Sequence, residues 1–267
     1  MPNRKSSPLP RAAARIRRGY FECRFGQLHV HHAIPGGGGF EEATPVLALH
    51  PAGHSGALYG ALLAALGEDR SAFAPDLPGF GQSEHPGVLS VGELAAALGD
   101  FLDTMRLRQI DLVGCGLGAH VVLELLATHP AVRRLVIAAL PTAAIPPPPR
   151  NAGATDEFLR AICASARTDC GVDAPPEAVF SACGERLQHA AAAAQAGVLE
   201  QTRPLRERLR AVTHPLLILH GPEHPHGFAL TAADLPPQTQ RAACAGIAAL
   251  EVGAAPLVGA IHSFLTT

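Results

Sequence analysis

The stretch that most constrains this chain is "RQIDLVGCGLGAHVVLELLATHP" at residues 108–130. Its first part is a short apolar run that predicts a buried strand, and its last part carries apolar residues at helical spacing. The glycine-rich turn "GCGLG" joins the two. A strand that passes through such a turn directly into a helix places the turn residue at the edge of a sheet, where many enzymes present a nucleophile.

Composition limits what this turn can be part of. The chain has 267 residues, of which 48% are hydrophobic, enough for one large core with an insertion. A formal net charge of -2 with 16% charged residues argues against nucleic acid or an anionic membrane as partner. Six scattered cysteines favour a reducing compartment, and no apolar run approaches the length of a membrane span. We therefore expect a cytoplasmic protein.

Strand signals alternate with helix signals, a pattern typical of a parallel sheet covered on both faces. Residues 1–18 are predicted to form a flexible basic arm, and residues 20–34 a hairpin. Residues 141–213 break the rhythm with a proline-rich connector followed by helical periodicity, which predicts a helical lid inserted between core segments 19–140 and 214–267. Further strands are predicted at 45–50, 71–77, 110–114, 133–140, 215–221 and 239–245, and helices at 57–70, 90–107 and 255–267.

Four segments together resemble the α/β-hydrolase fold: "LALHPAGHSG", "FAPDLPGFGQSEHPG", the strand-turn-helix stretch and "PLLILHGPEHP". They come in the order and at the spacing of that fold, and the resemblance covers nearly everything from Gly19 to the C-terminus. It implies a mostly parallel, doubly wound α/β sheet of the α/β-hydrolase type with an inserted helical lid. Because fold alone does not define function, each position of the site is compared separately.

The family's elbow is G-x-S-x-G, with small residues two before and two after the nucleophile. Gly114 and Gly118 match those flanking positions, so Gly116 stands where the resemblance places the serine. Cys115 is the alternative nucleophile, since a thiolate attacks readily. That alternative shifts the register by one and puts larger residues where small ones are needed.

The other two triad positions also depart from the family. His224 stands at the acid position, with Glu223 one residue early, and Ile247 stands where the histidine is expected. Three such changes remove the base and its orienting partner together with the nucleophile. Complete loss of a triad costs about a millionfold in rate, so we expect no ordinary serine-ester hydrolysis.

The resemblance also indicates residues that bind a ligand. The backbone N–H groups of Ala52 and Leu117 correspond to the oxyanion hole of the family. His50 and His54 lie at the carboxyl end of a predicted strand, where ligands bind in such sheets, and His224 is expected at the rim of the pocket. His50 has a second expected role, because that position commonly braces the oxyanion turn.

A metal site is the most specific function that the 14 histidines suggest. "HVHH" places His29 and His31 on one face of a strand, but no carboxylate or cysteine joins the pair at ligand spacing. We therefore predict no metal and no cofactor. Asp76 in "PDLPGFG" resembles a position that ties a loop together, so we interpret it as structural.

Three functions remain open: small-molecule binding or non-hydrolytic catalysis of the lyase, isomerase or cyclase type in a lidded pocket, ester hydrolysis through Cys115 or an unrecognised site, and a structural role beside an active relative. With two tyrosines and no tryptophan, the composition favours a small aliphatic or weakly polar ligand. Whether the chain forms homo- or hetero-oligomers stays open.

Overall fold

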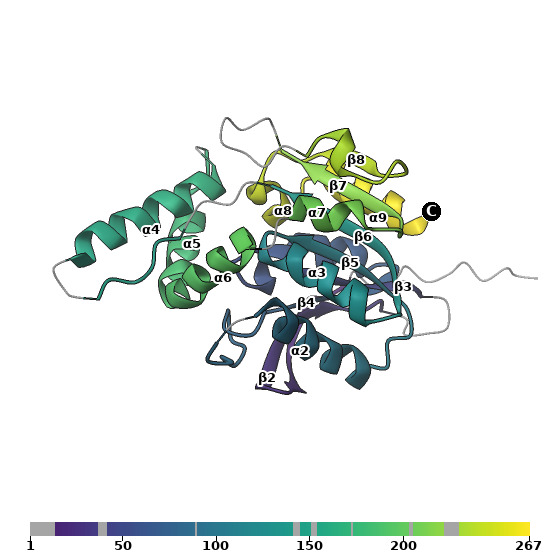
Figure 1. Ribbon diagram of the computed structural model, residues 1–267, viewed down its shortest axis with the longest axis horizontal. Coiled ribbons are helices and arrows are strands. Elements are labelled where there is room, and N and C mark those ends of the chain that lie inside the picture. The colour runs from purple at the N-terminus through teal and green to yellow at the C-terminus, as the bar shows by residue number, and fades with distance from the viewer. Residues whose placement is uncertain are drawn as a thin grey trace, which may run out of the picture.

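The computed structural model describes residues 14–36, 42–88, 90–140, 145–150, 154–171, 173–202, 205–221 and 230–267. An eight-stranded sheet in the order β1-β2-β4-β3-β5-β6-β7-β8 runs through it (Figure 1). The β1–β2 and β2–β4 pairings are antiparallel, and all others are parallel. This confirms the predicted fold class. The strands are β1 (Arg17–Cys23), β2 (Gly26–Ala33), β3 (Ala43–Leu49), β4 (Arg70–Pro75), β5 (Ile110–Cys115), β6 (Val132–Ala139), β7 (Leu216–His220) and β8 (Gln240–Ala243).

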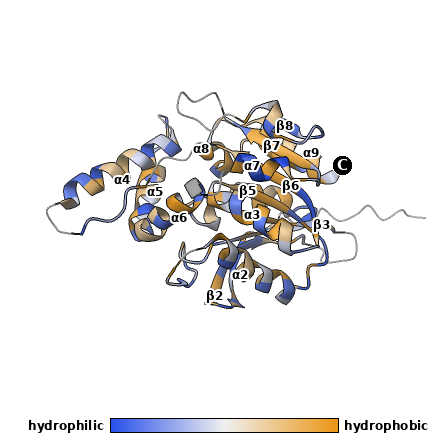
Figure 2. Ribbon diagram, in the orientation of Figure 1, coloured by the Kyte–Doolittle hydropathy of each residue, from blue (hydrophilic) through white to orange (hydrophobic). Residues whose placement is uncertain are grey.

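Helices cover both faces of the sheet. One face packs against α2 (Val91–Thr104) and α3 (Leu117–Thr128), and the other against α1 (Gly60–Leu66), α8 (Ile247–Glu251) and α9 (Ala255–Thr266). Every residue of β4 and β5 is buried, as expected for strands covered on both sides, and Figure 2 shows the central strands as mainly hydrophobic. None of the helices in the described ranges is long and apolar enough to cross a membrane.

Two elements differ from the sequence prediction. Strand β1 begins at Arg17, two residues inside the segment assigned to the arm, because Arg17 pairs with His32 across the hairpin. The arm up to residue 13 lies outside the described residues. The five-residue helix α8 was not predicted, since so short an element gives no periodic signal.

Within the described residues, four helices lie between β6 and β7: α4 (Thr155–Cys170), α5 (Pro176–Gln188), α6 (Ala190–Thr202) and α7 (Leu205–Arg210). Figure 1 shows α4 and α5 beside the sheet, with α6 between them and α3. Ala192, Ala193 and Ala196 of α6 join the main core, whereas α4 and α5 share a small cluster of their own. We call α4, α5 and α6 the cap helices.

The strand order creates a switch point beside β3. The chain passes from β3 to β4 on one side and then crosses to β5 on the other side of β3. At such a switch point the connections diverge and leave a crevice at the carboxyl ends of the strands. The turn after β3 and the elbow after β5 both lie there.

Candidate functional site

Gly116 forms the elbow between β5 and α3. Its φ of 50° and ψ of -122° lie outside the regions that residues with a side chain adopt readily, so glycine suits the position. Its carbonyl oxygen accepts a hydrogen bond of 2.9 Å from the N–H of Ala119, which starts the helix. The structure thus places Gly116 at the turn itself.

The residues flanking Gly116 have no room for side chains. A Cβ on Gly118 would lie 2.1 Å from the carbonyl oxygen of Leu49, and one on Gly114 would lie 2.8 Å from the Cα of Ala119. Small residues are therefore required two positions before and two positions after Gly116. The geometry supports the register that centres on Gly116 and not the register shifted to Cys115.

Cys115 is fully buried in the core on the face of α1 and α9. Burial raises the pKa of its thiol far above the usual range, and the neighbouring Glu200 carboxyl raises it further. A neutral, enclosed thiol is a poor nucleophile.

His50 braces the turn that follows β3. Its Nε2 atom accepts a hydrogen bond of 2.9 Å from the N–H of Leu77, so its Nδ1–H donates to the Pro51 carbonyl oxygen at 2.8 Å. Burial lowers the pKa of His50 to about 4, which keeps the ring neutral. Both ring nitrogens are engaged, so the ring has no nitrogen left for the ligand contact that the sequence suggested.

The turn and the elbow are bonded to each other. The N–H of Gly118 donates a hydrogen bond of 3.2 Å to the carbonyl oxygen of His50. This bond brings Ala52, the other predicted oxyanion residue, to the same edge of the sheet as Leu117. Ala52 is partly buried against the main core.

The N–H of Leu117 donates a hydrogen bond to the carboxyl group of Glu200, on cap helix α6. Burial raises the pKa of Glu200 to about 7, and the Leu117 hydrogen bond opposes this rise. Sequence reasoning missed this residue. A signal was present, because Ala192, Ala196 and Glu200 are spaced four apart and so share one face of the helix, and both alanines are buried.

A polar cluster ties the turn after β3 to the other cap helices. The Nη2 atom of Arg186 lies 2.5 Å from Oδ2 of Asp169 and 3.3 Å from Nε2 of His54. Beside it, the Ser55 hydroxyl donates a hydrogen bond of 2.8 Å to Glu185. Arg186 is fully buried and the Asp169 side chain is 5% exposed, so these charges depend on each other for compensation. His54 therefore contacts the cap.

Of the other two predicted triad positions, one is not described and the other is buried. His224 and Glu223 lie outside the described residues. Ile247 is the first residue of α8 and is buried in the core. The loop of residues 244–246 that follows β8 contains no histidine.

His262 of the final helix lies in a different place. Its Nε2 atom pairs at 3.0 Å with Asp69. Asp69 directly precedes β4, so it lies at the amino ends of the parallel strands, whereas the elbow lies at their carboxyl ends. Both residues line a surface hollow of about 630 Å³. This hollow is separate from the candidate site.

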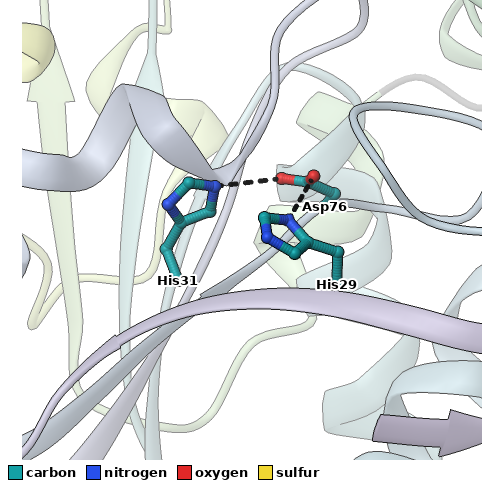
Figure 3. Close-up of side chains that lie close together, drawn as sticks. All are labelled: His29, His31 and Asp76. Carbon is teal, nitrogen blue, oxygen red and sulfur yellow. Dashed lines mark hydrogen bonds and ion pairs between the residues drawn. The ribbon is translucent and has the colours of Figure 1, made fainter. Parts of the chain in front are cut away.

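His29 and His31 do have a carboxylate beside them, and the expectation that none joins the pair is wrong. Asp76 follows β4, which lies next to β2 in the sheet although far from it in sequence. Figure 3 shows both imidazoles turned toward this carboxylate. Asp76 also accepts hydrogen bonds from the N–H groups of Gly56 and Gln82, at 2.7 and 2.8 Å, which agrees with its interpretation as a structural tie.

The comparisons with known proteins agree with this architecture. The family model described as the alpha/beta hydrolase family matches residues 46–261, and the chain belongs to this family. An enol-lactonase from Burkholderia xenovorans LB400 is similar, with 18% identity, a TM-score of 0.74, and coverage of 93% of this chain and 100% of that one.

Two further solved structures show the same likeness of fold. A serine-to-glycine variant of the N-acyl homoserine lactonase AidH, complexed with N-hexanoyl homoserine lactone, has 21% identity, a TM-score of 0.71 and coverage of 94% and 97%. A hydrolase from Pseudomonas aeruginosa PA01 has 23% identity, a TM-score of 0.69 and coverage of 94% and 98%. A comparison with curated proteins gave no match.

The buried pair of Arg186 and Asp169 yields a stability prediction. Replacing Arg186 with leucine removes the guanidinium that compensates the buried Asp169 carboxylate, so the free energy of unfolding should fall by about 3 kcal/mol or more. The double variant Arg186→Leu, Asp169→Leu should recover most of that loss. Chemical denaturation measures both, with exposed Arg167→Leu on α4 as control, expected within about 0.5 kcal/mol of the parent. Equal losses in the single and double variants would contradict the pairing.

Proposed function

We propose that this member of the alpha/beta hydrolase family binds a small, weakly polar molecule between its core and its cap helices, and acts on it by non-hydrolytic acid–base chemistry without a covalent intermediate. The observation that carries the proposal is Gly116 at the elbow, where the family presents its nucleophile. A glycine has no side chain to acylate. The site therefore offers binding and proton transfer.

The surroundings of Gly116 support this proposal. The loop after β8 supplies no histidine to act as a base. Cys115, the alternative nucleophile, is enclosed, and its raised pKa keeps it a neutral thiol. In a comparable system, loss of a whole triad costs about a millionfold in rate, equivalent to roughly 8 to 9 kcal/mol of transition-state stabilisation.

Glu200 supplies the acid–base group in this proposal. Its carboxyl lies at the Leu117 N–H, beside the position that a nucleophile's side chain would fill. A general base works best when its pKa is close to the working pH, and burial brings Glu200 to about 7. Proton removal from a bound molecule, followed by bond cleavage or migration within it, is chemistry of the lyase or isomerase type.

The ligand class follows from the site and its relatives. The core around the elbow is apolar, and a ligand carbonyl that displaces the Glu200 carboxyl from the Leu117 N–H would accept that hydrogen bond. One similar solved protein, a serine-to-glycine variant of a lactonase, is complexed with an acylated lactone. We therefore propose a small acyl compound as the ligand.

The absence of a nucleophile is tested by covalent labelling. Organophosphonate probes that trap activated serines should leave the wild-type mass unchanged, because no hydroxyl stands at the elbow. Gly116→Ser should label only weakly, because the loop after β8 contains no histidine to activate the new hydroxyl. Iodoacetamide should alkylate Cys115 only after unfolding. Stoichiometric phosphonate labelling of the wild type, or a burst of product with p-nitrophenyl butyrate, would overturn the proposal.

The role of Glu200 is tested with a probe of proton abstraction. When a base removes the carbon-bound proton of 5-nitrobenzisoxazole, the ring N–O bond breaks and a coloured cyanophenolate forms. The ionised carboxylate is the active form, so the rate should rise as pH increases through about 7 and level off above it.

Glu200→Gln removes the base and should lower this rate by about a hundredfold. The matched control is Glu177→Gln, which changes an exposed carboxyl on cap helix α5 and should leave the rate and its pH profile unchanged. A profile that is the same in Glu200→Gln and wild type would exclude Glu200 as the base.

A further inference from the structure

His29, His31 and Asp76 form a second cluster, on the antiparallel side of the sheet. His29 and His31 are two residues apart on β2, so their side chains project from the same face of the strand. Val30 pairs with Pro75 across β2 and β4, and this register carries Asp76 to the two imidazoles. One ligand atom from each residue lies within 4.8 Å of the other two.

The distances suit a tetrahedral metal ion. Zinc bonds of about 2.0–2.2 Å place neighbouring ligand atoms about 3.4 Å apart. His29 Nδ1 lies 2.8 Å from Oδ2 of Asp76, and His31 Nε2 lies 3.7 Å from Oδ1. The two ring centroids are 4.8 Å apart. Small rotations of the imidazoles would bring all three donors onto one ion.

The carboxylate is already oriented for this role. Oδ1 accepts a hydrogen bond from the N–H of Gly56, and Oδ2 accepts one from the N–H of Gln82. In Figure 3 dashed lines join Oδ2 to His29 and Oδ1 to His31. A carboxylate oxygen can accept a backbone hydrogen bond and still offer a lone pair to a metal ion. Backbone donors of this kind hold a metal-binding carboxylate in place.

Burial also favours a metal. The side chains of His29 and Asp76 are 3% and 2% exposed, and that of His31 is 12% exposed. A buried carboxylate needs positive charge, and a divalent ion supplies it. Because the His31 side chain is slightly exposed, an ion can reach the cluster from solvent.

We propose that His29, His31 and Asp76 bind a divalent transition-metal ion of the zinc type, with a fourth position open to water. Two imidazole nitrogens and one carboxylate oxygen are the donor set of many three-ligand zinc sites. On binding, the metal takes the Nδ1 lone pair of His29 in place of the contact between Nδ1 and Asp76, and the single ring proton is carried on Nε2. The site is independent of the proposed function at the elbow.

The proposed site has a structural consequence. Through Gly56, Asp76 holds the start of the helical turn that follows His54 and Ser55. An ion on Asp76 would therefore stiffen the turn that carries Ala52. We expect the melting temperature to rise with Zn²⁺.

The experiment is a calorimetric titration of chelator-treated full-length protein with Zn²⁺. We expect one equivalent to bind, and His31→Ala to weaken that binding at least tenfold. His32→Ala is the matched control, because His32 lies on the same strand with its side chain on the opposite face. It should bind as the wild type does.

Co²⁺ gives an independent readout. Its visible absorption should indicate a tetrahedral site in the wild type and in His32→Ala, and this signal should be lost in the conservative variant His31→Gln. Wild-type protein that binds no Zn²⁺, or binds it equally well without His31, would overturn the proposal. If His31→Ala fails to fold, the His31→Gln spectrum decides.

Discussion

A backbone contact between α3 and the end of β3 sets the geometry of the candidate site. The N–H of Gly118 bonds to the carbonyl oxygen of His50, and the space at Gly118 excludes even a Cβ atom because the Leu49 carbonyl oxygen would lie 2.1 Å from it. Two backbones approach this closely only where a side chain is missing. The contact fixes the helix start, and with it the direction of the Leu117 N–H.

The rest of the site follows from that contact. Because α3 begins so close to β3, the elbow must turn sharply, and Gly116 adopts a positive φ to do so. The turn after β3 is held from one side by His50 and from the other by the cap, through the buried charges of Arg186 and Asp169. Helix α6 then brings the Glu200 carboxyl to the Leu117 amide. The strand, turn and helix of the elbow are therefore retained around a residue that has no side chain.

Sequence reasoning succeeded where the signal was local. The apolar runs, the paired glycines around Gly116 and the helical periodicity each reflect a few neighbouring residues, and the strands and α3 lie close to their expected positions. Sequence reasoning failed where segments that are far apart in the sequence meet in the fold. Asp76 reaches His29 only because β4 inserts between β2 and β3, and nothing near Asp76 in sequence indicates that order. Glu200 was missed because an alanine-rich helix gives a weak apolar stripe.

The central claim is that the elbow geometry persists with glycine in the nucleophile's place and a cap carboxyl on its amide. A high-resolution crystal structure of the unliganded protein tests this most directly. We predict a φ near +50° at Gly116 and the Glu200 carboxyl hydrogen-bonded to the Leu117 N–H. A negative φ at Gly116, with Glu200 turned toward solvent, would contradict the account.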